Sequence, residues 1–228
     1  MVLALAVISA VVLAWIAGAI ALATGQRISF RQAFLLVPIA LAHRLGVRSG
    51  GHLHSDPPVV YAILHQSQLD PALMLSLLPA DTLHILDEVS ARSVWLDPWR
   101  EIGRTIPFNP EHVFVSRRLV RHLKGNGRLA IYFPDGIEPE TKAYRLYRAV
   151  ARIALRAGAC VVPVSVHGSR NTLFAPKRGQ RRGPFARLRL KALEPLDIPG
   201  LVSRSTREQS SAAAALFDRV MEADAPAR

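Results

Sequence analysis

The chain has 228 residues, half of them hydrophobic, and a formal net charge of +12. This length suffices for one domain with a sizeable core, and the single Cys160 excludes an intrachain disulfide. A chain both apolar and basic favours an anionic membrane surface over nucleic acid as its partner, although charge alone does not separate the two.

An uncharged, predominantly apolar stretch covers residues 1–24. A helix of this length can cross a hydrocarbon core of about 30 Å. No Lys or Arg precedes the stretch, whereas a secretory signal begins with a basic region, so we expect a retained membrane helix. A cleaved signal and an interfacial or re-entrant hairpin are the alternatives. By the positive-inside rule, the cations that follow closely place the remainder in the cytoplasm: Arg27, Arg31, Arg44 and Arg48.

Residues 30–45 are apolar with few charges, and they are suited to lie against the same membrane surface. We therefore divide the chain into an N-terminal membrane-associated segment, residues 1–48, and a globular domain, residues 49–228.

Apolar runs alternate with helical patterns along the globular domain. The patterns predict strands at 59–64, 128–133, 160–166 and 188–193, and helices at 71–78, 142–157 and 206–221. Gly158 is a suitable C-cap for the second of these helices, and Cys160 lies in an apolar run that indicates packing. Strands that alternate with helices predict an α/β fold with helices covering the faces of the sheet.

A His and an Asp follow the first predicted strand five residues apart. His65 comes directly after the strand, and Asp70 precedes Pro71. Within one regular helix or strand this spacing points the two side chains apart. They meet only if the chain turns after His65 and Asp70 opens the next helix, which Pro71 favours. The pair is then a base with its orienting carboxylate, and the alternative is a surface histidine beside a helix N-cap.

A second polar turn, Pro134-Asp135-Gly136, ends the strand predicted at 128–133. Ligands of α/β proteins gather at the carboxyl ends of strands. If the two strands lie near each other, this turn and the His65 turn border one cleft.

These motifs, in this order, resemble those of the glycerolipid acyltransferase family that includes the 1-acylglycerol-3-phosphate acyltransferases. The matching positions are His65, Ser67 and Asp70 in the first motif, Gly103 and Arg104 in the second, Phe133, Pro134, Asp135 and Gly136 in the third, and Pro163 in the fourth. The resemblance covers residues 58–197. It implies a glycerolipid-acyltransferase-like α/β sheet covered by helices, preceded by a membrane helix or hairpin. Within the family, the acyltransferase portion of the bifunctional 2-acylglycerophosphoethanolamine acyltransferase/acyl-carrier-protein synthetase is the closest likeness.

The resemblance implies a membrane-bound O-acyltransferase. His65 would take a proton from a lysophospholipid hydroxyl as it attacks an acyl thioester, and Asp70 would orient His65. The donor would be acyl-carrier protein or acyl-CoA, and no metal or other cofactor is expected. The remaining motif residues would bind substrate: Ser67, Gly103, Arg104, Phe133, Pro134, Asp135 and Gly136.

Departures from the family pattern bear on the acceptor. The second motif ends in Asn109-Pro110, and Ile137-Glu138 follows the third, where the family carries arginines for a phosphate monoester. Their loss favours a lysophospholipid over 1-acylglycerol-3-phosphate, the alternative acceptor, although three other arginines could substitute: Arg104, Arg117 and Arg118. Asp135 stands where Glu is usual, so a divergent, non-catalytic lipid-binding protein is the alternative from another class.

Residues 170–191 contain many Lys and Arg and no acidic residue. We expect this stretch to contact anionic lipid or an acidic carrier protein; a solvated loop and nucleic-acid binding are the alternatives. Few aromatic residues interleave with the cations to stack on bases, which speaks against nucleic acid. His52 and His54 form a His-x-His pair without a further ligand in the pattern, so we expect no metal site there.

Overall fold

A computed structural model gives the fold, and it describes residues 2–48, 50–86, 88–107, 113–136, 144–176, 182–198, 200 and 208–225. At its centre is a seven-stranded sheet in the order β1-β7-β6-β2-β5-β3-β4. The strands are β1 Gly46–Arg48, β2 Val59–His65, β3 Leu83–Leu86, β4 Arg104–Pro107, β5 Arg128–Pro134, β6 Cys160–His167 and β7 Arg189–Ala192. Neighbouring strands run parallel except β6 and β7.

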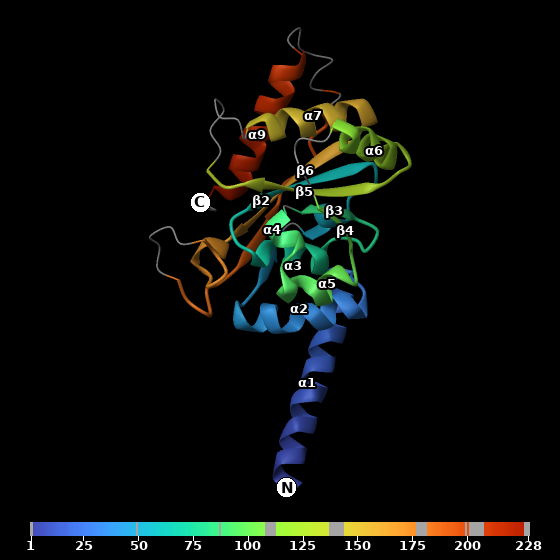
Figure 1. Cartoon of the computed structure of the whole chain (residues 1–228). Coiled ribbons are helices and arrows are strands. Elements are labelled where there is room, and N and C mark those ends of the chain that lie inside the picture. The colour runs from blue at the N-terminus through green and yellow to red at the C-terminus, as the bar shows by residue number, and fades with distance from the viewer. Residues whose placement is uncertain are drawn as a thin grey trace.

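Helices cover both faces of this sheet (Figure 1). On one face lie α2 Phe30–Ala42, α3 Leu69–Leu77 and α5 Asp97–Arg100. On the other lie α6 Val113–Lys124, α7 Arg145–Ala157 and α9 Glu208–Asp224. Short helical segments complete the described chain: η1 Gly50–His54, α4 Glu88–Ala91, η2 Val94–Leu96 and η4 Ser169–Asn171. The expected α/β class is confirmed.

The central position of β2 in the sheet explains why its sequence is an unbroken apolar run. Val59, Tyr61 and Ile63 pack toward α3, whereas the residues between them pack toward α7 and α9. Every residue from Val59 to Leu64 is buried. A strand covered on both faces loses the polar alternation of a half-exposed strand.

Helix α1, Val2–Gln26, extends away from the body of the molecule (Figure 1). Its 25 residues are long and apolar enough to cross a membrane by length and composition, and Ala19 alone is buried. Near the middle of α1, the indole Nε1 of Trp15 donates to the Phe34 carbonyl at 3.0 Å. Helix α2 in turn is fixed to α3, because Gln32 Nε2 donates to the carbonyls of Leu75 and Leu78 at 3.0 and 2.8 Å.

The structure also departs from the sequence predictions. Strands β1, β3 and β4 and helix α6 were not predicted. The three strands have three or four residues each, and apolar and charged residues do not alternate along them as they do along β7. Helix α3 begins at Leu69, two residues before the predicted start. Strand β1 begins at Gly46, so the sheet starts inside the segment that we assigned to the membrane-associated part. The division at residue 48 stays a prediction.

Candidate active site

His65 and Asp70 are brought together at the carboxyl end of β2. The strand ends at His65, the chain turns, and Asp70 lies in the first turn of α3. His65 Nδ1 is 3.5 Å from Asp70 Oδ2, somewhat longer than a good hydrogen bond. Such contacts are often long without substrate and tighten when it binds. The turn that the spacing required is therefore present.

Asp70 does not act as the helix N-cap that its position before Pro71 suggested. Gln68 is the N-cap residue, and its side chain makes no capping bond. Instead, Asp70 Oδ2 accepts the backbone N–H groups of Gln66 at 2.7 Å and Ser67 at 2.8 Å. The carboxylate is fully buried. These donors and the N-terminal end of α3 stabilise its negative charge beside the imidazole.

Ser67 serves the same turn. Its hydroxyl accepts the Leu69 N–H at 3.2 Å and lies 3.0 Å from Thr172 Oγ1. Because Thr172 donates its own proton to the Ser169 carbonyl, the Ser67 hydroxyl is the donor in that pair. Ser67 is buried, and these contacts favour a role in holding the turn over direct contact with substrate.

A buried pair of polar side chains, unnoticed in the sequence, borders His65. The Tyr132 ring on β5 meets the His65 ring edge-on with centroids 5.9 Å apart, and its hydroxyl lies 3.0 Å from Nδ1 of His84 on β3. Burial raises the pKa of Tyr132, as does the charge of Asp70. Burial lowers the pKa of His84 to about 3. Both groups are neutral near pH 7. A His and a Tyr inside apolar runs were the only sequence signal.

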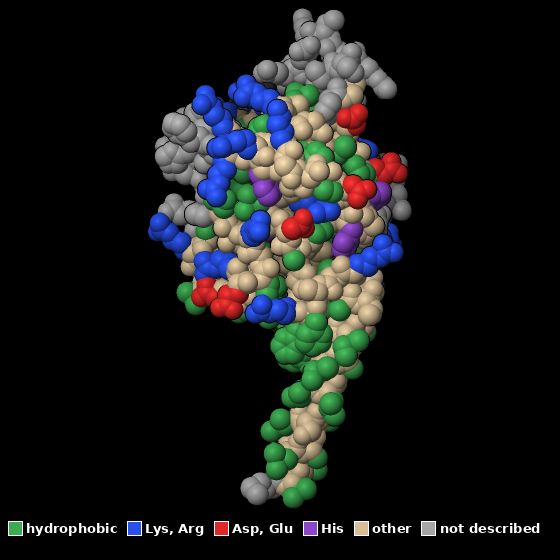
Figure 2. Space-filling view, turned by 90° about the vertical axis from the view of Figure 1, so that its right-hand side faces the viewer, with side chains coloured by type: hydrophobic (Ala, Val, Ile, Leu, Met, Phe, Trp, Pro, Cys, Tyr) green, Lys and Arg blue, Asp and Glu red, His purple; other side chains and the backbone are tan. Residues whose placement is uncertain are grey.

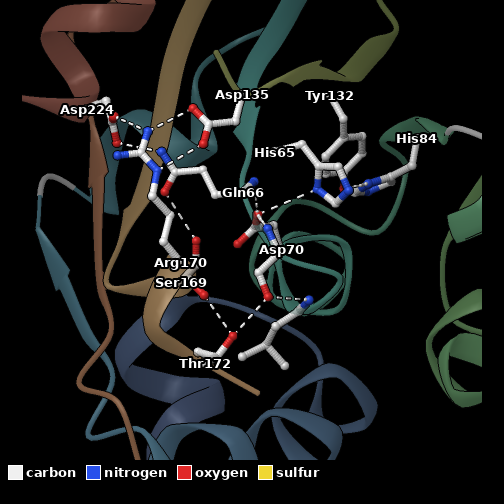
Figure 3. Close-up of polar contacts among 12 residues, drawn as sticks. His65, Gln66, Asp70, His84, Tyr132, Asp135, Ser169, Arg170, Thr172 and Asp224 are labelled. Atoms are coloured by element: carbon white, nitrogen blue, oxygen red, sulfur yellow. Dashed lines mark hydrogen bonds and ion pairs between the residues drawn. The ribbon is translucent and has the colours of Figure 1, made fainter. Parts of the chain in front are cut away.

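Asp135, at the end of β5, is held in a salt-bridge network (Figure 3). Arg170 donates to both its carboxylate oxygens, from Nε at 3.0 Å and from Nη2 at 2.8 Å. The same Nη2 lies 2.8 Å from Asp224 Oδ2 at the end of α9. Burial opposes the charge of Arg170, but the hydrogen bonds and charges of Asp135 and Asp224 outweigh it and raise the pKa of Arg170.

Gln66 connects this network to the His65 turn. Its Nε2 donates to Asp224 Oδ1 at 2.7 Å, and its Oε1 accepts from the Ser169 hydroxyl at 3.3 Å. Ser165 Oγ also donates to Asp224 Oδ1, at 3.0 Å. The residue after His65 is therefore anchored by the C-terminal helix, which no local sequence pattern indicated.

The two predicted turns lie side by side, because β2 and β5 are neighbours and His65 pairs in register with Pro134. Pro134 and Gly136 are exposed there, and Gly136 adopts a φ of 74° that favours glycine. Phe133 is fully buried on the opposite face against Tyr147, with ring centroids 4.2 Å apart. That placement suits packing better than substrate contact.

The second motif lies further along the sheet, where β4 is the edge strand. A Cβ on Gly103 would meet the end of the Leu75 side chain of α3, so that side chain would have to shift. Arg104 is exposed on β4, and Arg117 and Arg118 are exposed on α6. Ile137-Glu138, Asn109-Pro110 and Lys177, Arg178 and Arg181 lie outside the described residues.

No group of three His, Cys, Asp or Glu side chains suited to a metal ion occurs among the described residues. His52 and His54 lie in η1, and His54 Nδ1 is 3.5 Å from the Gly50 carbonyl.

Comparisons with known proteins bear on the family and the fold. The family model described as Acyltransferase matches residues 44–167, which include both turns. A solved structure, the crystal structure of the 1-acyl-sn-glycerophosphate (LPA) acyltransferase PlsC from Thermotoga maritima, matches with a TM-score of 0.57. The match is 20% identical and covers 87% of this chain and 83% of that chain, a likeness that supports the fold.

Proposed function

The chain belongs to the acyltransferase family, and we propose that it is a membrane-bound O-acyltransferase that transfers a fatty acyl group from an acyl thioester to the hydroxyl of a lysophospholipid. The buried Asp70 carboxylate, 3.5 Å from His65 at the carboxyl edge of the sheet, is the observation that carries the mechanism. Acyl-carrier protein and acyl-CoA are both suitable donors.

His65 is the general base of the proposed reaction. Because Nδ1 faces Asp70, Nε2 accepts the proton of the acceptor hydroxyl as its oxygen attacks the thioester carbonyl. The tetrahedral intermediate then collapses, the C–S bond breaks, and the departing thiolate takes the proton from the imidazolium. Asp70 keeps the proton of the neutral ring on Nδ1 and stabilises the imidazolium. No acyl-enzyme intermediate is needed.

The salt-bridge network bears on the choice of acceptor. Among the described residues, Arg170 is a cation next to the His65 turn, and Asp135 and Asp224 surround it with two negative charges. A phosphate monoester, which carries nearly two negative charges at neutral pH, meets repulsion there. The phosphodiester of a zwitterionic lysophospholipid carries one negative charge, which the positive charge of its own headgroup offsets. The network therefore supports a lysophospholipid acceptor, in line with Glu138 and Pro110 at the positions of the family's arginines.

The second candidate acceptor is 1-acylglycerol-3-phosphate, the acceptor named for the Thermotoga maritima protein. It would need a phosphate anchor, for which the exposed arginines Arg104, Arg117 and Arg118 are available. A non-catalytic lipid-binding role is not favoured, since the site keeps its histidine and carboxylate.

The proposed location is a membrane, with the catalytic domain on its cytoplasmic face. Helix α1 has the length and composition to enter the bilayer, and α2 joins it to the sheet domain. Arg27, Arg31, Arg44 and Arg48 follow α1 and favour the cytoplasmic side.

Acyl transfer to paired acceptors tests this proposal. The purified full-length protein is assayed with a zwitterionic lysophospholipid and with 1-acylglycerol-3-phosphate at matched surface concentration. We expect a higher kcat/KM for the lysophospholipid and a narrower difference in Glu138→Arg. A clear preference of the unmodified protein for the phosphate monoester would contradict the acceptor assignment.

A further inference from the structure

Exposed apolar side chains are unevenly distributed over the described surface. Most of the large ones lie on α1 and α2. Outside these two helices the described residues include four: Val94, Leu173, Phe174 and Phe185, which are 78%, 57%, 41% and 73% exposed. We refer to these four residues as the apolar rim. Large apolar groups confined to one region of an otherwise polar surface mark a binding site.

The apolar rim lies against the loop that carries His65. Val94 precedes Trp95, whose ring stacks on Phe174 with centroids 5.2 Å apart. The Phe174 carbonyl accepts the backbone N–H of Gln68 at 3.1 Å, and Gln68 lies between His65 and Asp70. Val94, Leu173 and Phe174 are thereby placed beside the candidate active site.

The rim also adjoins helix α2. Phe185 precedes Ala186, whose carbonyl lies 2.9 Å from Nδ1 of His43, the C-cap residue of α2. The Leu188 N–H donates to the His43 carbonyl, also at 2.9 Å. Near this end α2 exposes Leu41, at 75%. The apolar surface is therefore continued from α1 along α2 to Phe185.

We propose that the apolar rim is a second membrane-contacting surface, which seats the mouth of the active site in the headgroup region of an anionic bilayer. Exposed aliphatic and aromatic groups flanked by Arg182, Arg187 and Arg189 have the chemistry of an interfacial anchor. The rim would let the lysolipid reach His65 without leaving the bilayer. This last step rests on the proposed function, whereas the membrane contact does not.

A bilayer is favoured over a protein partner because the rim adjoins α2, and α2 packs against α1, the helix long and apolar enough to cross a membrane. The face of the molecule formed by α6 and α7 exposes side chains of a different kind. Helices α6 and α7 expose cations and no acidic residue: Arg117, Arg118, Arg121, Lys124, Arg145, Arg148, Arg152 and Arg156. That face lies on the far side of the sheet from α2 and the start of α1 (Figure 1). It provides a control position that a membrane at the rim would not touch.

The membrane contact is tested with an environment-sensitive fluorophore on the full-length protein in anionic phospholipid vesicles. Cys160→Ala removes the native thiol, and Leu173→Cys, Phe185→Cys and Arg152→Cys each introduce one labelling site. We expect blue-shifted emission, and quenching by a quencher attached to lipid, at 173 and 185 but not at 152. Emission at 173 and 185 equal to that at 152 overturns the proposal. A blue shift without lipid quenching also overturns it, because it indicates a protein partner.

The role in substrate access is tested with Val94→Ser, Leu173→Ser and Phe185→Ser combined, which leaves Phe174 and its bond to Gln68 intact. We expect KM for a vesicle-bound lysophospholipid to rise about tenfold, because lost apolar burial weakens surface contact. The kcat value, and transfer to a short-chain acceptor in solution, should not change. An equal loss with both acceptors contradicts the access role. If the unmodified protein transfers no acyl group, the proposed function fails, and the fluorescence result still decides the membrane contact.

Discussion

Asp70 is fully buried from solvent, so neighbouring groups have to stabilise its charge. Its Oδ2 accepts two backbone N–H groups and faces the His65 ring, and its Oδ1 is buried without a hydrogen-bond partner among the described residues. Removing the charge would spare the shape of the turn and remove the stabilisation of an imidazolium. The residue is suited to hold a proton on His65 during the reaction.

We expect Asp70→Asn to lower kcat by about 10²–10⁴-fold, the range that general-base catalysis contributes. The matched control is Asp81→Asn, an exposed carboxylate that pairs with Arg128 away from the site. Steady-state kinetics of purified variants measure the effect. Near-normal turnover of Asp70→Asn would show that the carboxylate does not support the base.

His84 makes stability depend on pH. Its folded-state pKa of about 3 lies below the ordinary value of 6.5, so between these values the unfolded chain binds a proton that the folded chain does not. The free energy of unfolding therefore decreases as the pH is lowered across this window, by about 1.4 kcal/mol per pH unit. In His84→Gln, whose amide oxygen can still accept from Tyr132, we expect a shallower slope. Urea unfolding in detergent between pH 6.5 and 4.5 measures both slopes, and equal slopes would contradict the assignment.

Helix α9 acts on the site through its last turn. Asp224 receives hydrogen bonds from Gln66, Ser165 and Arg170, which come from three other parts of the fold. The sequence predicted this helix to end at 221, so Asp224 fell outside it. Long-range polar contacts of this kind leave no periodic signal, because they join residues as much as 158 positions apart.

Asp224→Ala leaves three donors without their acceptor. We expect the free energy of unfolding to fall by about 1–3 kcal/mol, and kcat to fall because Gln66 loses its anchor. Asp224→Asn should recover part of both, since its amide oxygen still accepts hydrogen bonds. Thermal unfolding measures the change in stability, and steady-state kinetics measure the change in kcat. The anchoring role is wrong if the alanine variant matches the unmodified protein in both.

At the scale of the whole molecule, apolar and basic surfaces are segregated. Lys and Arg side chains are spread over the body, whereas α1 carries none (Figure 2). The net charge of +12 thus reflects in part the cations of α6 and α7, which face away from α2. Composition suggested a membrane partner, and in the location that we propose the membrane side is formed by apolar helices rather than by the cations of α6 and α7.

The sequence predicted the parts of the fold that carry strong local signals. Apolar runs and turn residues mark the elements that were predicted: strands β2, β5, β6 and β7, helices α3, α7 and α9, and the turn between His65 and Asp70. Strands β3 and β4 were missed although β7 has the same length, because apolar and charged residues alternate from Leu188 to Ala192 and no such alternation marks β3 and β4. Tyr132, His84, Arg170 and Asp224 were missed as site residues because tertiary packing brings them together. The identity of Asp135 was noticed, but its pairing with Arg170 required the fold.

The central claim is tested most directly by an acyl-transfer assay. A labelled acyl group is offered as a thioester, with a vesicle-bound zwitterionic lysophospholipid as acceptor, to the unmodified protein and to His65→Ala. We expect diacyl product from the unmodified protein and a rate lower by at least about 10²-fold in the variant, with membrane fractionation unchanged. Near-normal turnover in His65→Ala, or no transfer to any lysolipid by the unmodified protein, would contradict the account.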